Sequence, residues 1–538
     1  MVDDGEAGPA LPGGQEFDED DDEGRFFGGG VSRREEEILD YMDRREGEDA
    51  GPEKIDVAWL RKLALGFEKR ISKNAEMRGK WEDQPEKFMQ SETELDEAIK
   101  GLSILSEHPE LYEELANLGC AASMVGLLTH ENTDIAGDMV EVISELTDED
   151  VDAEAEQWGF LVDAMMDADV AEILVSNLER LDESVEGERG FVYHTLSIFE
   201  NLASQKRIAE AIATKSRLLS WLLKRLQVRE SPISQNKQYT GEVLSILLQS
   251  SVVNRKHLIQ LPNMNGIDIL LQLLSPYRKL DPAKGSEEEE LLENIFDAVT
   301  CVVGEIEGRE KFVEAEGVEL ALIMLREGKM SKPRALRLLD HAMAGEGGVV
   351  VCERFVEALG LKTLFGMFMK KQDGQTTEHI LGIFASLLRA LPAESPARIR
   401  TLVKFVEKEY EKIGKLISLR EGYAARVKEV ERGIEKQKKE VNEEEWEEYE
   451  AEWFSMRLDG GLFCLQLVDL IVAWLCAEDD GARRRVEEEL GKRSVGISVV
   501  RETLKEQLVG LEEGAEEGEV DEEAKHVREM LRTLIQFL

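Results

Sequence analysis

A short apolar helix recurs along this chain at an interval of about 43 to 51 residues, and this period limits the folds open to it. In the clearest copies it follows a glycine. The six copies begin at Gly119, Asp169, Ser216, Gly266, Gly317 and Gly360. We expect each glycine to let the chain reverse between two helices, where a residue with a Cβ atom would be strained.

A longer helix with one apolar face follows each copy, after a polar spacer. In the last of them Ile380, Ile383 and Phe384 follow the i, i+3, i+4 spacing of a helix buried on one side. No segment alternates apolar and polar residues with a period of two, so no sheet is expected. The pattern predicts an all-α protein, an armadillo- or HEAT-like α-solenoid superhelix with helical N- and C-terminal caps. Such stacks usually leave a long concave face open for binding.

Changes in composition divide the chain into five parts. We predict a disordered acidic tail over residues 1–50 and an N-terminal helical cap over 51–114. About six armadillo-like repeats fill 115–395. A long charged helical region follows over 396–452, and a C-terminal helical cap closes the chain over 453–538.

The charge balance bears on the kind of partner. The chain has 66 basic and 113 acidic residues, a formal net charge of −47. Such a surface repels phosphates, so direct binding of nucleic acid is not expected and a basic protein partner is favoured. The alternative is that the acidic side chains only form a solvated, solubilising face.

Cysteine spacing and hydropathy indicate the compartment. The five cysteines form no CxxC pair, which favours a reducing environment, and the N-terminus lacks the apolar region of a secretory signal. The apolar segment from Gly461 to Cys476 is interrupted by Gln466 and Asp469 and is shorter than a bilayer requires. We expect a core helix there and no membrane association.

Signals for catalysis or metal binding are weak. His341 and Asp340 are adjacent on a predicted helix, so their side chains diverge and lack triad geometry. His379 has no second histidine at metal-ligand spacing. The GEGG sequence at Gly345 follows a helix rather than a strand and lacks the GK[ST] of a phosphate loop. We predict no catalytic residue, no metal site and no cofactor.

Longer stretches carry a specific resemblance. They lie between about residues 57 and 475 and include PEKFM at Pro85, NLERLDESV at Asn177, NKQYTGEVLSILLQ at Asn236, NGIDILLQLLS at Asn265, LRLLDHAM at Leu336 and RLDGGLF at Arg457. With these stretches the chain resembles the beta-catenin-like protein 1 family of armadillo-type nuclear proteins.

The resemblance implies a function. Family members are non-catalytic scaffolds of pre-mRNA splicing in the nucleus. They associate with the Nineteen complex and its Myb-domain subunit, and they bind basic, nuclear-localisation-like segments of splicing proteins. The tail departs from the family because arginines such as Arg33, Arg34, Arg44 and Arg45 stand among acidic residues instead of forming a basic cluster. The sequence leaves a homodimer open.

Comparison with importin-type armadillo proteins suggests where a basic peptide would lie. In those proteins a Trp and an Asn on each third helix line the groove. Alignment of the apolar faces puts other residues at these positions: Glu141 and Glu145, Ser197 and Asn201, Asp297 and Cys301, and Arg337 and His341. The tryptophans are missing, but carboxylates are available for charge-assisted hydrogen bonds to Lys or Arg. We predict Glu141, Glu145, Asn201 and Asp297 as groove residues.

Alternatives stay open. The alignment could slip by one residue, or these positions could be ordinary exposed ones. A nuclear-import-type adaptor would need a Trp/Asn ladder and an autoinhibitory basic arm, neither of which is visible. An enzyme on a helical scaffold would need clustered catalytic residue types, which the sequence does not supply.

Overall fold

The computed structural model describes residues 54–441, 446–513 and 522–538. The predicted tail over residues 1–50 lies outside these ranges. By their internal contacts the residues form two units, one up to Leu202 and one from Ala203 onward. Every regular element in the described ranges is a helix, which confirms the all-α prediction.

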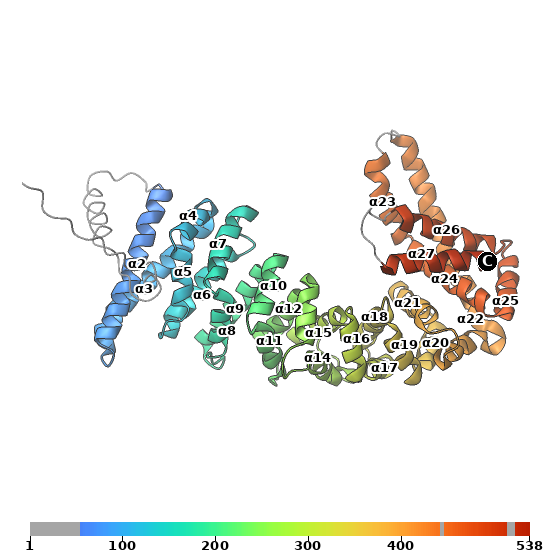
Figure 1. Cartoon of the computed structure of the whole chain (residues 1–538), viewed down its shortest axis with the longest axis horizontal. Helices are drawn as coiled ribbons and strands as arrows, with labels where there is room; N and C mark the ends of the chain where they lie inside the picture. The colour runs from blue at the N-terminus through green and yellow to red at the C-terminus, as the bar shows by residue number, and fades with distance from the viewer. Residues whose placement is uncertain (1–53, 442–445, 514–521) are drawn as a thin grey trace, which may run out of the picture. The chain divides into compact units, whose positions relative to one another are not determined.

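The first unit contains a helical cap and two three-helix repeats (Figure 1). Its α-helices are α2 (Val57–Lys80), α3 (Met89–Lys100), α4 (Tyr112–Asn117), α5 (Cys120–Leu127), α6 (Thr133–Thr147), α7 (Ala155–Asp167), α8 (Val170–Leu178) and α9 (Glu186–Ala203). There are also three short 3-10 helices: η1 (Pro85–Lys87) lies between α2 and α3, and η2 (Gly101–Glu107) and η3 (Pro109–Leu111) connect α3 to α4.

The second unit begins with four more repeats. Their α-helices are α10 (Lys206–Lys215), α11 (Leu218–Gln227), α12 (Gln235–Ser250), α13 (Val252–Ile259), α14 (Gly266–Leu274), α15 (Glu287–Val302), α16 (Ile306–Glu314), α17 (Gly317–Glu327), α18 (Ser331–Met343), α19 (Val349–Glu357), α20 (Gly360–Phe368) and α21 (Gly374–Ala390). One 3-10 helix, η4 (Ser275–Arg278), follows α14. The six copies found in the sequence correspond to the second helices α5, α8, α11, α14, α17 and α20.

The role predicted for the glycines holds at Gly119, whose φ of 74° is left-handed, but it is wrong at Gly360. There the left-handed residue is Leu359, with a φ of 63°, and Gly360 is already part of α20. A Cβ atom on Gly360 would lie 2.6 Å from the ring of Phe355 on the preceding helix. This glycine is therefore required by close packing between the first and second helices of the repeat.

The close packing recurs in two other repeats, and at one of them a left-handed residue again precedes the glycine. Before α17 the left-handed residue is Glu316, and a Cβ atom on Gly317 would lie 2.3 Å from the Phe312 ring. A Cβ atom on Gly266 would lie 2.7 Å from a methyl carbon of Leu258. At Gly266, Gly317 and Gly360 the glycine thus allows a close approach of two helices, whereas an added Cβ atom on Gly119 would meet nothing within 4 Å.

In the second unit the third helices α12, α15, α18 and α21 contact one another in order, and α24 (Leu462–Glu478) contacts α21. Neighbouring repeats are also joined by the fully buried Asn254, whose amide donates to Ala209 O at 3.3 Å and to Leu247 O at 2.9 Å. These contacts continue the hydrophobic core from one repeat to the next.

Beyond the repeats, α22 (Pro396–Glu440) lies in the region predicted to be long, charged and helical, and it is broken at one place. Residues 407–410 leave helical geometry, and the last three of them have left-handed φ angles of 55° to 62°. Left-handed backbone costs about 1–2 kcal/mol per residue. Buried Lys412 stabilises the break by donating to Glu407 Oε1 at 3.0 Å, and Tyr410 donates to Asp479 Oδ1 at 3.3 Å. The chain turns a corner here and packs its second half against α24 and α25 (Asp480–Gly491).

The remaining helices complete the second unit. They are α23 (Trp446–Asp459), α26 (Ser498–Glu513) and α27 (Glu522–Phe537). The second half of α22 and α23 lie side by side as a hairpin (Figure 1). The apolar segment predicted as a core helix is α24, and most of its residues are buried. Among the described residues no single helix has the length and hydropathy to cross a membrane, although the bent pair α23–α24 passes the same test by composition.

Candidate protein-binding face

The third helix of the first repeat, α6, carries four carboxylates on one face. Asp134, Asp138, Glu141 and Glu145 are spaced four, three and four residues apart, which places them along one side of a helix. Glu141 and Glu145 are exposed, and neither carboxylate has a hydrogen bond or ion pair with any residue that the structure describes. The opposite side, with Val140 and Ile143, is buried in the core. We refer to these four carboxylates as the α6 acidic face.

Within the α6 acidic face, Asp138 lies close to other carboxylates and has only one cation near it. The carboxyl groups of Asp138 and Asp96 on α3 are hydrogen-bonded to each other, and the nearest cation, Lys100 Nζ, is 2.9 Å from Asp96 Oδ2 but 3.7 Å from Asp138 Oδ2. Burial, followed by the contact with Asp96, raises the pKa of Asp138 to about 7, and Glu141 contributes further repulsion. Lys100 is therefore the counter-ion of both Asp96 and Asp138, and this face would attract an additional cation.

Asn201, on α9, directs its side chain toward the neighbouring helix α6 and not toward a partner. Its amide Nδ2 is 3.4 Å from Thr147 Oγ1 and 3.5 Å from Ser144 O. Asn201 therefore connects two third helices within the first unit.

Asp297 lies in the second unit, and its carboxylate is already paired. Its Oδ1 accepts from Arg337 Nη2 on α18 at 2.6 Å. Arg337 also reaches Glu293 at 3.1 Å, and Glu293 accepts from Arg334 as well. Burial, opposed by Arg337, raises the pKa of Asp297 above its usual range. A partner's Lys or Arg would have to compete with Arg337 for this carboxylate.

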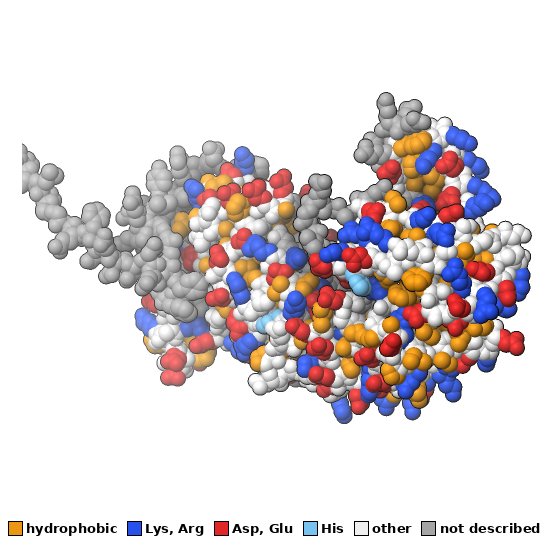
Figure 2. Space-filling view, turned by 45° about the vertical axis from the view of Figure 1, so that its right-hand side comes forward, with side chains coloured by type: hydrophobic (Ala, Val, Ile, Leu, Met, Phe, Trp, Pro, Cys, Tyr) orange, Lys and Arg blue, Asp and Glu red, His pale blue; other side chains and the backbone are white. Residues whose placement is uncertain are grey.

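An acidic side chain is also paired between the next two third helices, α18 and α21. Asp340 Oδ2 lies 2.9 Å from His379 Nδ1 on α21, and burial raises the pKa of Asp340. A Cβ atom on Gly382 would lie 2.3 Å from Asp340 Oδ1, so a glycine is needed beside this contact. On the face shown in Figure 2, acidic and basic side chains are likewise interspersed rather than gathered into one acidic wall.

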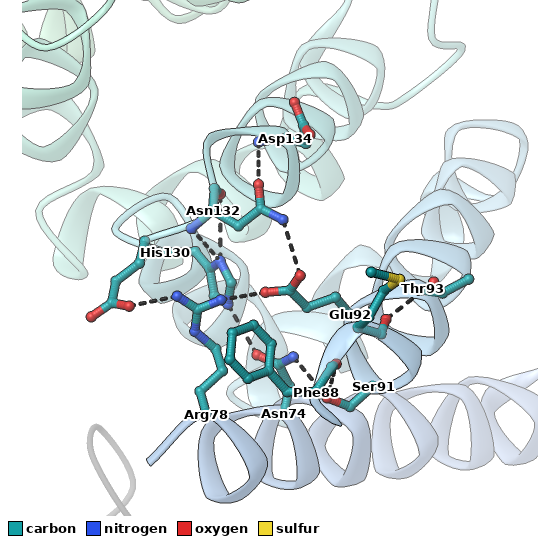
Figure 3. Close-up of polar contacts among 11 residues, drawn as sticks. Asn74, Arg78, Phe88, Ser91, Glu92, Thr93, His130, Asn132 and Asp134 are labelled. Atoms are coloured by element: carbon teal, nitrogen blue, oxygen red, sulfur yellow. Dashed lines mark hydrogen bonds and ion pairs between the residues drawn. The ribbon is translucent and has the colours of Figure 1, made fainter. Parts of the chain in front are cut away.

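A polar network joins the cap to the first repeat (Figure 3). Arg78 on α2 donates to Glu92 and Glu131, and its guanidinium lies 4.8 Å from the centre of the Phe88 ring. His130 Nε2 lies 3.0 Å from Asn74 Oδ1, and its Nδ1 accepts from Asn132 N at 3.1 Å. This network fixes the start of α6, which carries the acidic face.

Acidification should weaken the first unit through His130. Burial, followed by the nearby Arg78 charge, lowers the pKa of His130 below 6.5. Because the unfolded chain then binds the proton more strongly, the stability from this group is present above pH 6.5 and lost as the pH falls, by up to about 1.4 kcal/mol per pH unit. We expect wild type to lose more unfolding free energy between pH 7.5 and 5.5 than a His130→Gln variant. Parallel curves for the two proteins in denaturant titrations would rule this out.

Comparison with known proteins settles the family. The model of the family described as "Catenin-beta-like, Arm-motif containing nuclear" matches residues 36–505. The chain belongs to this family.

Named relatives in the catenin-beta-like family cover most of the chain. The beta-catenin-like protein 1 homolog of Schizosaccharomyces pombe is 37% identical over 501 residues, 93% of this chain and 87% of that protein. Beta-catenin-like protein 1 of Mus musculus is 41% identical and that of Homo sapiens 40%, each over 474 residues, 86% of this chain and 83% of the relative. A solved chain from work on the interaction between cadherin and beta-catenin has a TM-score of 0.47 at 11% identity, over 93% of this chain and 96% of its own.

Within this catenin-beta-like chain, the structure separates the predicted groove residues. Glu141, Glu145 and Asn201 lie in the first unit, whereas Asp297 lies in the second. Sequence reasoning missed Asp138, although its spacing from Glu141 and Glu145 was visible. It also missed the contact between Arg337 and Asp297, for which no local signal exists because the two residues are 40 positions apart in the sequence.

Proposed function

We propose that this chain is a non-catalytic scaffold of pre-mRNA splicing in the nucleus, and that its α6 acidic face binds basic segments of partner proteins. The proposed partners are splicing proteins with such segments, including the Myb-domain subunit of the Nineteen complex. The observation that carries the proposal is the pair of exposed carboxylates, Glu141 and Glu145, which lack a partner among the described residues. The nuclear description of the family supports the location.

The four groove residues contribute unequally in this proposal. Glu141 and Glu145 bind Lys or Arg directly, because charge-assisted hydrogen bonds to an exposed carboxylate need no rearrangement. Asn201 fixes the helix beside them. Asp297 takes part only where a partner's cation replaces Arg337, whose Nη2 now lies 2.6 Å away. Binding is therefore expected to centre on the first unit.

Charge reversal tests the proposed face. We expect Glu141→Lys with Glu145→Lys to weaken binding of a labelled peptide with four consecutive Lys/Arg residues roughly tenfold at low salt, since two attractive pairs become repulsive. The loss should shrink as salt screens the contacts. Fluorescence anisotropy at 50 mM and 500 mM NaCl measures both effects.

A matched variant separates local contact from net charge. Glu113→Lys with Glu156→Lys makes the same charge change at exposed positions on α4 and α7 and should leave affinity nearly unchanged. Equal losses in both variants would mean that only overall charge matters, and the α6 acidic face would be abandoned as the site.

Recovery from nuclear extract tests the splicing assignment. At low salt the wild-type chain should retain splicing proteins with basic segments, and the doubly reversed variant should retain fewer of them. Retention of a transport receptor with its cargo, without splicing proteins, would point instead to a nuclear-import-type adaptor.

A further inference from the structure

A small cavity in the second unit has a lining whose charge is opposite to that of the chain as a whole. It has a volume of about 160 Å³ and lies where the end of α20, the following loop, α21 and the second half of α22 meet. Its lining residues are Phe368, Lys370, Lys371, Gln372, Thr377, Ile380, Lys415 and Leu419. Three of these are lysines and none is acidic, in a chain with a net charge of −47.

None of the three lysines has its charge neutralised by a carboxylate that the structure describes. Lys370 and Lys371 are exposed, Lys415 is half-buried, and none of them forms an ion pair with a carboxylate in the described part of the chain. The acidic residue nearest in sequence, Asp373, is directed to the start of α21. Its Oδ1 accepts from Thr376 N at 2.8 Å and its Oδ2 from the Thr376 hydroxyl at 2.7 Å. The cavity therefore holds cations without an internal counter-ion, unlike the arginines of α18.

The rest of the lining is fixed and partly apolar. Gln372 Nε2 donates to Met367 O at 2.8 Å, which orients the amide and leaves its second N–H unused by this contact. The Thr377 hydroxyl donates to Asp373 O at 2.7 Å. Buried Phe368 and Ile380 supply apolar surface. A ligand here would place an anionic head against the lysines and a short carbon stem against this apolar surface.

We propose that this cavity binds a phosphate monoester carried by a serine or threonine of a partner protein. A phosphorylated side chain has a charge of about −1.5 to −2 and three acceptor oxygens, which suits two or three lysines. The cavity has room for one such group rather than for a strand. A nucleic acid would bring many phosphates toward a strongly acidic protein, so a single phosphate group is the anion that the charge pattern accommodates.

Binding of peptide libraries to the full-length chain tests the proposal. One library has a central phosphoserine and the other an unmodified serine at the same place. We expect the phosphorylated library to bind roughly tenfold more tightly, because charge-assisted contacts to the phosphate are added. The variant Lys370→Gln/Lys371→Gln/Lys415→Gln should remove this preference. Inorganic phosphate should compete at high concentration.

A second triple variant controls for net charge. Lys284→Gln/Lys428→Gln/Lys505→Gln removes the same charge from exposed positions elsewhere and should keep the preference. Thermal unfolding confirms that both variants fold, since surface substitutions usually change stability by less than about 0.5 kcal/mol. Equal binding of the two libraries to wild type, or a preference that survives loss of the three cavity lysines, would overturn the proposal. So would binding of inorganic phosphate with no binding of the phosphorylated library, or tighter binding of a single-stranded RNA than of that library.

Discussion

Replacing Arg420 with methionine should destabilise the second unit by about 3–5 kcal/mol, because it leaves a buried carboxylate without its counter-ion. Arg420 on α22 contacts Asp469 on α24 through two hydrogen bonds, from Nε at 2.7 Å and from Nη2 at 3.0 Å. Asp469 is completely buried and Arg420 nearly so. The pair joins the helix that follows the corner in α22 to the core helix of the C-terminal region.

The cost of Arg420→Met should depend on pH. Burial raises the pKa of Asp469 to about 6 even with Arg420 present. Without the arginine the carboxyl should bind its proton more strongly, and a carboxyl whose pKa is raised by folding favours the folded state as the pH falls. We therefore expect the deficit relative to wild type to be larger at pH 8 than at pH 5 in denaturant titrations.

Two further variants make the Arg420 prediction specific. Arg420→Met combined with Asp469→Leu should recover most of the loss, because an apolar pair needs no counter-ion. Arg432→Met removes the exposed contact between Arg432 and Glu429 and should stay within about 0.5 kcal/mol of wild type. A deficit below about 1 kcal/mol for Arg420→Met at pH 8 would show that Asp469 is accommodated in another way.

Two glycines of one helix should respond to alanine with opposite signs. Gly360→Ala should destabilise the chain by about 1–3 kcal/mol, because its Cβ atom would lie 2.6 Å from the Phe355 ring. Gly366, on the same helix, has no other group within 4 Å of an added Cβ atom. Gly366→Ala should stabilise by roughly 0.5–1 kcal/mol through helix propensity.

Chemical denaturation of both glycine variants beside wild type measures this contrast. A Gly360→Ala protein as stable as wild type would mean that Phe355 moves aside without cost. In that case the glycine of the repeat would need another explanation.

The sequence predicted the repeats because their signal is local. The second helices are short, apolar and regularly spaced, and each third helix has one buried face that satisfies a 3.6-residue period. The corner in α22 could not be predicted in the same way. Its left-handed residues are Lys408, Glu409 and Tyr410, none of which favours that conformation, and one of the two contacts that stabilise it comes from Asp479, far along the chain.

The predicted site residues show a similar division. The exposure of Glu141 and Glu145 follows from their own helix, where buried residues fill the other face. The pairing of Asp297 depends on Arg337 of the next repeat, and a charge count cannot show which acidic residues are already paired. The lysine-lined cavity could not be predicted from the sequence either. Its lysines come from separate parts of the chain, and the net charge of the chain is strongly negative.

The contact between α21 and α24 has a consequence for self-association. In a stack of repeats, each repeat buries an apolar face against the next one. The last repeat would leave such a face exposed unless another element covered it. Here the chain folds back after its corner and lays α24 against α21. The face of α21 on which a further repeat would stack is thereby already covered by the same chain.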